Sequence, residues 1–333
     1  MSEEIEDRIW RVFFPETVRQ VERIREKRTR FVHYTSAETG IAILRSNRML
    51  LRNSTLMNDF SEVHHGMSCL NAAVVGPTGD RLKLLMDKIQ SGLSEIVISN
   101  FNDQYDGVQS GTYLISISEH GDPEHGDVLE DQFGRLSMWR AYANKNGIAF
   151  VFKNTPFVSE TNVLNAYTSP VLYETPDSFE RHFTEVVDGI EREIDLLVSK
   201  GGQFFHDNLL NVFRFAVQST KHPSFREERE WRVIYSPSLL LRDGLLDTSQ
   251  VEKIPTEIMS LGGVPQRVYA IPFKNYPEEG FVGATVPELV DRIIIGPSQD
   301  ALTIAHAFVD ELTRCGVEKA HEKVTISGVP LRV

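Results

Sequence analysis

The alternation of apolar and polar residues predicts short strands along the whole chain. Five segments either alternate or run continuously apolar between turn residues, which is typical of strands. They cover residues 31–34, 111–118, 147–152, 231–235 and 268–273. Three other apolar runs predict further strands, at residues 49–52, 292–295 and 324–326. We expect the first five segments to belong to one central sheet.

Helical periodicity fills much of the chain between these strands. Apolar residues spaced three or four positions apart predict helices, which cover residues 16–28, 36–47, 81–101, 137–142 and 303–313. From Asp177 to about Thr220 the same spacing predicts two helices, broken at Gly201-Gly202. Residues 53–66 and 119–131 are polar and predict irregular structure.

The order of these elements predicts the fold class. Short strands scattered among helices favour an α+β protein over a doubly wound parallel sheet. We expect a central mixed or split β-sheet of short strands, with a helical insertion at about residues 178–220. Residues 1–29 are predicted to form an N-terminal helical segment, and residues 30–333 a single α+β domain.

Composition narrows the classes of protein that fit. Apolar residues make up 41% of the 333 residues, enough for a sizeable core, and the formal charge of −12 disfavours a broad nucleic-acid surface. No apolar run approaches the roughly 20 residues that a membrane-spanning helix needs. The acidic N-terminus differs from a secretory signal, and the two cysteines are isolated. We therefore expect a cytoplasmic protein with no membrane partner.

Four short segments place reactive side chains at a strand end or a helix start. The candidates are His33, Tyr34 and Thr35 in the first, Tyr113 and Ser116 in the second, Trp139 and Tyr142 in the third, and Glu228 and Glu230 in the fourth. The fourth segment is the most distinctive, because acidic residues lead directly into an apolar strand.

Together these segments resemble the bacterial family known as domain of unknown function 2971. The shared hallmarks are His-Tyr-Thr-Ser at 33–36, Asn58-Asp59 with Glu62, Met138-Trp139 with Tyr142 and Gly147, Glu228-x-Glu230-Trp231-Arg232, Ile294-Ile295-Gly296-Pro297, and Ser327–Arg332. The resemblance runs from about residue 30 to the C-terminus. Phe60 departs from the proline that the pattern has after Asn-Asp. Membership of this family implies no particular activity.

The order His33, Tyr113, Glu230 is also similar to the His-Tyr-Glu series of the ADP-ribosyltransferases. In that superfamily one strand carries the histidine, a later Gly-x-Tyr strand the tyrosine, and a further strand the glutamate. The resemblance implies an ADP-ribosyltransferase-like sheet, with NAD as a substrate. It also implies ADP-ribosyl transfer to a protein or nucleic acid, or NAD hydrolysis, in a bacterial toxin or defence effector.

The chemistry of NAD cleavage suggests a role for each residue of the series. Breaking the nicotinamide–ribose bond gives an oxocarbenium-like transition state, which a nearby carboxylate stabilises. The resemblance assigns this role to Glu230, and to Glu228 the orientation of an acceptor group. His33 would hold the adenosine ribose, and Tyr113 would stack on nicotinamide. The expected NAD site is completed by Tyr34, Thr35, Ser116, Trp139 and Tyr142.

Structural roles for the same residues are the main alternative. Single histidines and aromatic residues are more often part of the packing, and Glu-Arg runs are often solvated ion pairs. The chain would then be a nucleotide-sensing or protein-interaction module. An enzyme should place His33, Tyr113 and Glu230 around one cleft, whereas a binding module need not.

A metal-dependent nuclease is the second alternative. Asp59, Glu62, His64 and His65 lie within seven residues and are oxygen and nitrogen ligands that suit a divalent ion. Adjacent histidines seldom bind the same metal, so we expect no metal. The sequence also lacks a Gly-x-Gly-x-x-Gly or phosphate-loop motif, which disfavours a Rossmann or P-loop site.

Overall fold

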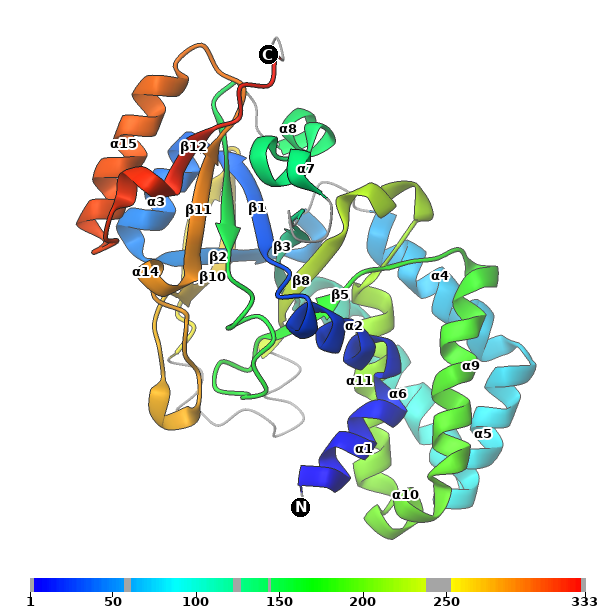
Figure 1. Cartoon of the computed structure of the whole chain (residues 1–333). Helices are drawn as coiled ribbons and strands as arrows, with labels where there is room; N and C mark the ends of the chain where they lie inside the picture. The colour runs from blue at the N-terminus through cyan, green and yellow to red at the C-terminus, as the bar shows by residue number, and fades with distance from the viewer. Residues whose placement is uncertain (1–2, 57–60, 122–126, 143–144, 238–252, 331–333) are drawn as a thin grey trace.

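Most strands in the described part of the chain form one large mixed sheet, seen at the centre of the computed structural model in Figure 1. The structure describes residues 3–56, 61–121, 127–142, 145–237 and 253–330. Ten strands of this part of the chain belong to the sheet: β1 (Phe31–Ser36), β2 (Arg48–Asn53), β3 (Tyr113–Glu119), β4 (Gly147–Phe152), β5 (Tyr167–Pro170), β8 (Glu230–Tyr235), β9 (Thr256–Leu261), β10 (Val264–Pro272), β11 (Val290–Ile295) and β12 (Val324–Ile326). The predicted α+β class and the single sheet for the five predicted strands are confirmed.

Strand β3 is the branch point of this sheet. One edge of β3 pairs along its length with β8, which also pairs with β5. The other edge pairs with β1 at Ser118 and Glu119, and with β2 at Tyr113 and Leu114. Two arms leave from these contacts, in the orders β1-β4-β11-β12 and β2-β10-β9. Within this sheet the described strand pairs are antiparallel except β11–β12, so the sheet is mixed and split.

Helices pack against both faces of the sheet, and a further group of helices lies beside it. Their bounds are α1 (Glu3–Phe13), α2 (Pro15–Glu26), α3 (Ala37–Ser46), α4 (Ser61–Val75), α5 (Pro77–Ile89), α6 (Leu93–Ser110), α7 (Val128–Phe133), α8 (Leu136–Tyr142), α9 (Pro176–Arg192), α10 (Ile194–Lys200), α11 (Gly202–Gln218), α14 (Val286–Leu289) and α15 (Ala301–Arg314). A pair of short parallel strands, β6 (Leu172–Tyr173) and β7 (Thr220–Lys221), joins the helices to β8. Within the described residues, no helix is long and apolar enough to cross a bilayer.

The helices α1, α4–α6 and α9–α11 surround a hydrophobic cluster of their own beside the sheet, on the right of Figure 1. The helices expected between 177 and 220 are present, and residues 61–110 pack with them. Three local predictions were wrong. Residues 119–131 were expected to be irregular, but α7 begins at Val128. Irregular structure was expected to residue 66, but α4 begins at Ser61, and the single helix expected over 81–101 is divided at Gly92, whose φ of 76° favours glycine.

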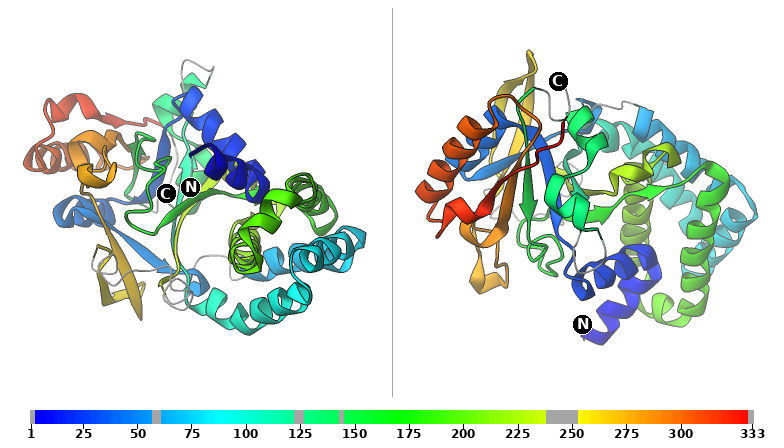
Figure 2. Two further views of the ribbon diagram at one scale, coloured as in Figure 1. Left: turned by 90° about the horizontal axis from the view of Figure 1, so that it is seen from below. Right: turned by 45° about the horizontal axis from the view of Figure 1, so that its top comes forward.

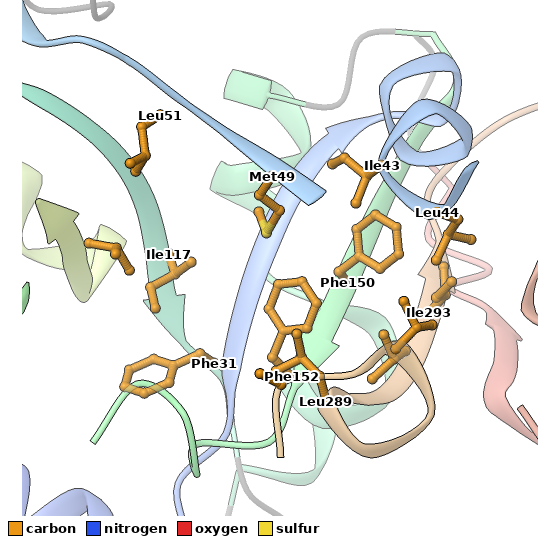
Figure 3. Packing of buried hydrophobic residues seen from close by; sticks show 14 of the residues in the cluster. Phe31, Ile43, Leu44, Met49, Leu51, Ile117, Phe150, Phe152, Leu289 and Ile293 are labelled. Carbon is orange, nitrogen blue, oxygen red and sulfur yellow. The ribbon is translucent and has the colours of Figure 1, made fainter. Parts of the chain in front are cut away.

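The two faces of the sheet bury different clusters. Phe31, Phe150 and Phe152 point into the larger cluster, which α3 and α15 cover (Figure 3). Val32, Tyr34, Ala149 and Val151 point the other way, toward α8. Because side chains alternate along a strand, this division defines two faces. We call the first the core face and the second the carboxylate face, after the residues of β8 that it carries.

Candidate functional site

Strand β8 carries charged residues on the carboxylate face. Trp231 is buried on the core face, and its neighbours Glu230 and Arg232 point to the opposite face. These two side chains are only 5% and 3% exposed. Since charged groups are seldom buried without partners, their contacts determine whether they are available for chemistry.

Both carboxylate oxygens of Glu230 accept hydrogen bonds from within the protein. The Ser116 hydroxyl donates to Oε1 over 2.5 Å, and Arg232 Nε donates to the same atom over 2.9 Å. Lys221 Nζ lies 3.2 Å from Oε2, and the backbone N–H of Glu230 donates to the hydroxyl of Tyr173 over 2.7 Å. Burial by itself raises the pKa of Glu230, but Arg232 and Lys221 outweigh it and hold the pKa at about 2.

Glu228 is the more accessible of the two carboxylates. Its side chain is 18% exposed, and it lies at the end of the short helix that precedes β8. Lys221 Nζ donates to Oε2 over 2.6 Å, and the Tyr142 hydroxyl donates to Oε1 over 3.1 Å. Lys221 therefore bridges Glu228 and Glu230. With Arg232, the cluster holds two carboxylates and two cations and carries no net formal charge.

Two aromatic residues and the end of β1 complete the carboxylate face. Trp139 of α8 is 1% exposed, and its Nε1 donates to the carbonyl oxygen of Phe133 over 2.8 Å. Its ring meets the ring of Tyr34 edge-on, at 4.8 Å. The Tyr34 hydroxyl accepts from the backbone N–H of Arg135, and burial raises its pKa to about 12. Trp139 is thus fully buried, whereas Tyr142 is half-buried.

His33, Thr35 and Tyr113 lie on the core face. His33 and Thr35 pair with Phe150 and Ile148 of β4, whose side chains belong to the core cluster. Tyr113 packs in the same cluster against Tyr269, with ring centroids 4.6 Å apart. The prediction that His33, Tyr113 and Glu230 surround one cleft was wrong, because Glu230 points to the opposite face.

One contact links His33 to the carboxylate face. Strands β1 and β3 diverge after Val32, and His33 Nδ1 donates across the gap to the carbonyl oxygen of Ser116 over 3.0 Å. Burial lowers the pKa of His33, against the opposing effect of this hydrogen bond. The side chain of Ser116 binds Glu230, so Ser116 lies between the histidine and the carboxylate.

The proposed metal ligands are only partly within the described chain. Asp59 and the side chain of Glu62 lie outside the described residues. His65 Nε2 lies 2.8 Å from the carbonyl oxygen of Glu174. Searched over the residues that the structure describes, the histidines, cysteines and carboxylates form no group of three or more that could hold a metal ion.

A cavity of about 870 Å³ opens on the core face of β3 and β8. Its walls come from the N-terminal helices α1 and α2, the segment 156–169, and the ends of β2 and β10. Ile115 of β3 and Val233 of β8 form part of its floor. Among the described residues that line it, none is one of the nine predicted site residues.

The comparison with family models covers the middle of the chain. Residues 138–233 match the model described as "Protein of unknown function (DUF2971)". Over these residues the chain is similar to the DUF2971 family. The resemblance predicted from the motifs is thereby confirmed. No curated protein and no solved structure matches the chain, so the ADP-ribosyltransferase resemblance stays a prediction.

The DUF2971 match runs from α8 to β8 and contains most of the carboxylate face. It includes three residues of the site that the sequence patterns did not single out as site residues: Tyr173, Lys221 and Arg232. Arg232 directly follows Glu-x-Glu-Trp, so its position next to this motif could have identified it as a site residue. Lys221 lies in a two-residue strand with no pattern of its own, so only the fold reveals that it bridges the two glutamates.

Proposed function

We propose that the chain is a ligand-binding module that takes a small, largely apolar molecule into the cavity on the core face. The cavity itself carries this proposal, because its volume of about 870 Å³ is within the usual range for ligand sites, roughly 300–1,000 Å³. Protein interiors are close-packed and hold few voids larger than a water molecule. A space of this size has the dimensions of a site rather than of a packing defect.

The chemistry of the walls supports an apolar ligand. The sheet contributes Ile115 and Val233, and the segment after β4 contributes Phe157 and Leu164. Burying about 200 Å² of apolar ligand surface against such walls is worth roughly 5 kcal/mol before the cost of association. Helices α1 and α2 form one side of the cavity, so binding depends on the N-terminal segment as well as on the sheet.

The carboxylate face is a weaker candidate for a ligand site than the cavity. The oxygens of Glu230 already accept bonds from Ser116, Arg232 and Lys221. Buried polar groups that are satisfied within the protein stabilise the fold without any ligand. An ionised carboxylate next to two cations also offers little net negative charge to a developing oxocarbenium ion.

Fluorescence of a neutral apolar dye tests the binding proposal. N-phenyl-1-naphthylamine is expected to bind the full chain and to accept energy from Trp10, which lines the cavity and is 44% exposed. Replacing the half-buried Ala166, which also lines the cavity, by tryptophan should fill the space and abolish dye binding.

The matched control is Ala307→Trp, which adds the same side chain at an exposed position of α15. This variant should bind the dye like the unaltered chain, and circular dichroism should show both variants folded. Equal dye binding by the folded Ala166→Trp variant and by the control contradicts the proposal.

Cleavage of NAD is a second candidate function. The observation in its favour is that Tyr34, Ser116, Trp139, Tyr142, Glu228 and Glu230 share the carboxylate face. Glu228 has the more exposed carboxylate, so this proposal now gives it the role of contacting the ribose, with Glu230 and Lys221 holding it in place. The acceptor would be a protein, a nucleic acid or water.

Nicotinamide release from NAD, measured with and without cell extract, tests this candidate. Glu228→Gln should cut turnover by roughly 100-fold or more, because it removes the charge but keeps the size of the side chain. Glu227→Gln, at an exposed neighbouring position, should leave turnover unchanged. Equal rates for the two variants, or no release by the unaltered chain, contradict NAD cleavage.

A further inference from the structure

The cavity on the core face has an acidic rim. Five carboxylates line it, from α1, α2 and the segment after β4: Glu4, Glu6, Asp7, Glu22 and Glu160. Two guanidinium groups also line it, those of Arg11 and Arg25. No other charged side chain is found among the described lining residues.

The two arginines offset only part of this negative charge. Arg11 donates to Asp7 and to Glu22, each over 2.7 Å, and Arg25 forms an ion pair with Glu160 at 2.7 Å. Five carboxylates against two guanidinium groups leave the described rim with a formal charge of −3. The whole chain has the same sign, at −12. Both fields attract cations and repel anions.

An aromatic pair stands among these acids. Trp10 and Phe14 both line the cavity, with ring centroids 4.9 Å apart. Glu6 and Asp7 precede Trp10 by four and three residues on α1, so they lie beside the indole on the helix surface. Aromatic faces attract ammonium groups within about 6 Å, and tryptophan does so best. Carboxylates together with an accessible indole suit a cation.

We infer that the molecule bound in the cavity is a cationic amphiphile, with an apolar body against the sheet and an ammonium group at the rim near Trp10. This inference rests on the proposed function and names the ligand class. The apolar floor at Ile115 and Val233 accepts the body, and the acidic rim selects the charge. Fatty acids and nucleotides of similar size carry the opposite charge and are disfavoured.

Three twelve-carbon ligands that differ only in the head group test the inference. Dodecylamine, dodecan-1-ol and dodecanoate are titrated below their micellar concentrations against the full chain carrying bound N-phenyl-1-naphthylamine, at pH 7 and low salt. Dodecylamine should displace the dye at a concentration roughly tenfold lower than dodecan-1-ol, and dodecanoate should be the weakest. Higher salt should narrow these differences, because it screens exposed charges.

Removing charge from the rim tests whether its carboxylates cause the preference for a cationic head group. The double variant Glu4→Gln and Glu6→Gln removes two exposed carboxylates of α1. It should weaken binding of dodecylamine several-fold and leave dodecan-1-ol unchanged. The matched control, Glu318→Gln with Glu322→Gln, removes two exposed carboxylates that do not line the cavity and should change neither.

The outcomes separate the inference from the proposed function. Equal displacement by all three ligands, or a stronger effect of dodecanoate, overturns the cationic preference while binding in the cavity stands. An unaltered dodecylamine affinity in the Glu4→Gln, Glu6→Gln variant overturns the role of the rim. Absence of dye binding by the unaltered chain overturns the binding module and the inference with it.

Discussion

The two faces of strands β3 and β8 use their residues in opposite ways. On the carboxylate face, Glu230 and Arg232 are buried and Ser116 is half-buried, and both Ser116 and Arg232 donate hydrogen bonds to Glu230. On the core face, Ile115 and Val233 border a cavity of about 870 Å³. Figure 2 shows the helical group, the N-terminal helices and the sheet around this region from two further directions. On these two strands, the carboxylate face carries paired charged groups, whereas the core face borders open space with apolar residues.

The contrast teaches that a distinctive motif and a binding site need not coincide. Glu-x-Glu-Trp-Arg is the most recognisable pattern of β8, yet the contacts of Glu230 are satisfied inside the protein. A buried ion pair of this kind is sensitive to the loss of either partner. The residues that border the cavity, such as Val233, are ordinary apolar residues that no motif distinguishes. Four predictions test this difference between the faces.

Removal of Arg232 is expected to have the largest effect on stability. Arg232→Met leaves Glu230 buried with a single cation, which should lower the free energy of unfolding by about 3–5 kcal/mol. Urea denaturation followed by circular dichroism measures the change. The control is Arg192→Met, at an exposed position of α9, which should change stability by less than about 0.5 kcal/mol. Similar urea midpoints for the two variants would mean that the charged cluster around Glu230 does not stabilise the fold.

Low pH is expected to have the second largest effect on stability, through the carboxylate face. The pKa of Glu230 is held at about 2, below its ordinary value of 4.5, so the unfolded chain binds a proton at a higher pH than the folded chain. Stability from this group is complete above about pH 4.5 and is lost as the pH falls toward 2. Each pKa unit is worth about 1.4 kcal/mol, so the loss is about 3 kcal/mol.

Urea midpoints measured between pH 5 and pH 3 check this dependence. The Glu230→Gln variant carries no titrating carboxylate at this position and should show a flatter pH dependence in that range. An equally steep loss in the variant would assign the acid sensitivity to other carboxylates.

Loss of one hydrogen bond in the same cluster should have a smaller effect. Ser116→Ala removes the hydroxyl that donates to Glu230 Oε1, and hydrogen bonds to charged groups contribute about 2 kcal/mol. The control is Ser118→Ala on the same strand face, since Ser118 pairs with Glu230 through the strand register but no hydrogen bond from its hydroxyl to the Glu230 carboxylate is described. Thermal unfolding of the two variants should differ by several degrees. Equal melting temperatures would show that the hydrogen bond from Ser116 to Glu230 does not stabilise the fold.

Enlargement of a residue on the cavity wall should have the smallest effect. Ala166→Leu adds methylenes to open space, so stability should change by less than about 1 kcal/mol. Ala149 of β4 is fully buried on the carboxylate face. The same substitution there should lower the free energy of unfolding by about 1–3 kcal/mol through overpacking. Urea midpoints measure both. A loss at Ala166 as large as that at Ala149 would show that the wall is packed rather than open.

Much of the strand content could be predicted from local patterns. The strand over 147–152 was predicted with its exact bounds, because its continuous apolar run reflects burial on both faces. Strand β5 was missed, since Tyr167–Pro170 is short, partly polar and ends in proline. Strand β9 was also missed, although Gly262-Gly263, both with positive φ, is a recognisable hairpin signal before β10. Its residues are exposed or half-buried, and they show no apolar alternation.

The N-terminal segment and the candidate site show the limit of such patterns. Helix α1 was not predicted as a separate element, and its end just before Pro15, the first residue of α2, turns the two helices over the cavity. The nine candidate site residues were chosen by their order along the chain. Six of them share a face, but His33, Thr35 and Tyr113 do not. Order along the chain carries no information on which face a side chain takes.

The sequence by itself determined the α+β class, the principal strands, the DUF2971 motifs and the opposite directions of Glu230 and Trp231, because these depend on neighbours within a few residues. Only the tertiary structure decided that His33 and Glu230 lie on opposite faces, since this follows from the registers of β1 with β3 and of β3 with β8, and a shift of one residue would reverse it. The cavity was likewise decided by tertiary structure. Its volume is what remains between α1, α2 and the sheet once segments distant in sequence have packed.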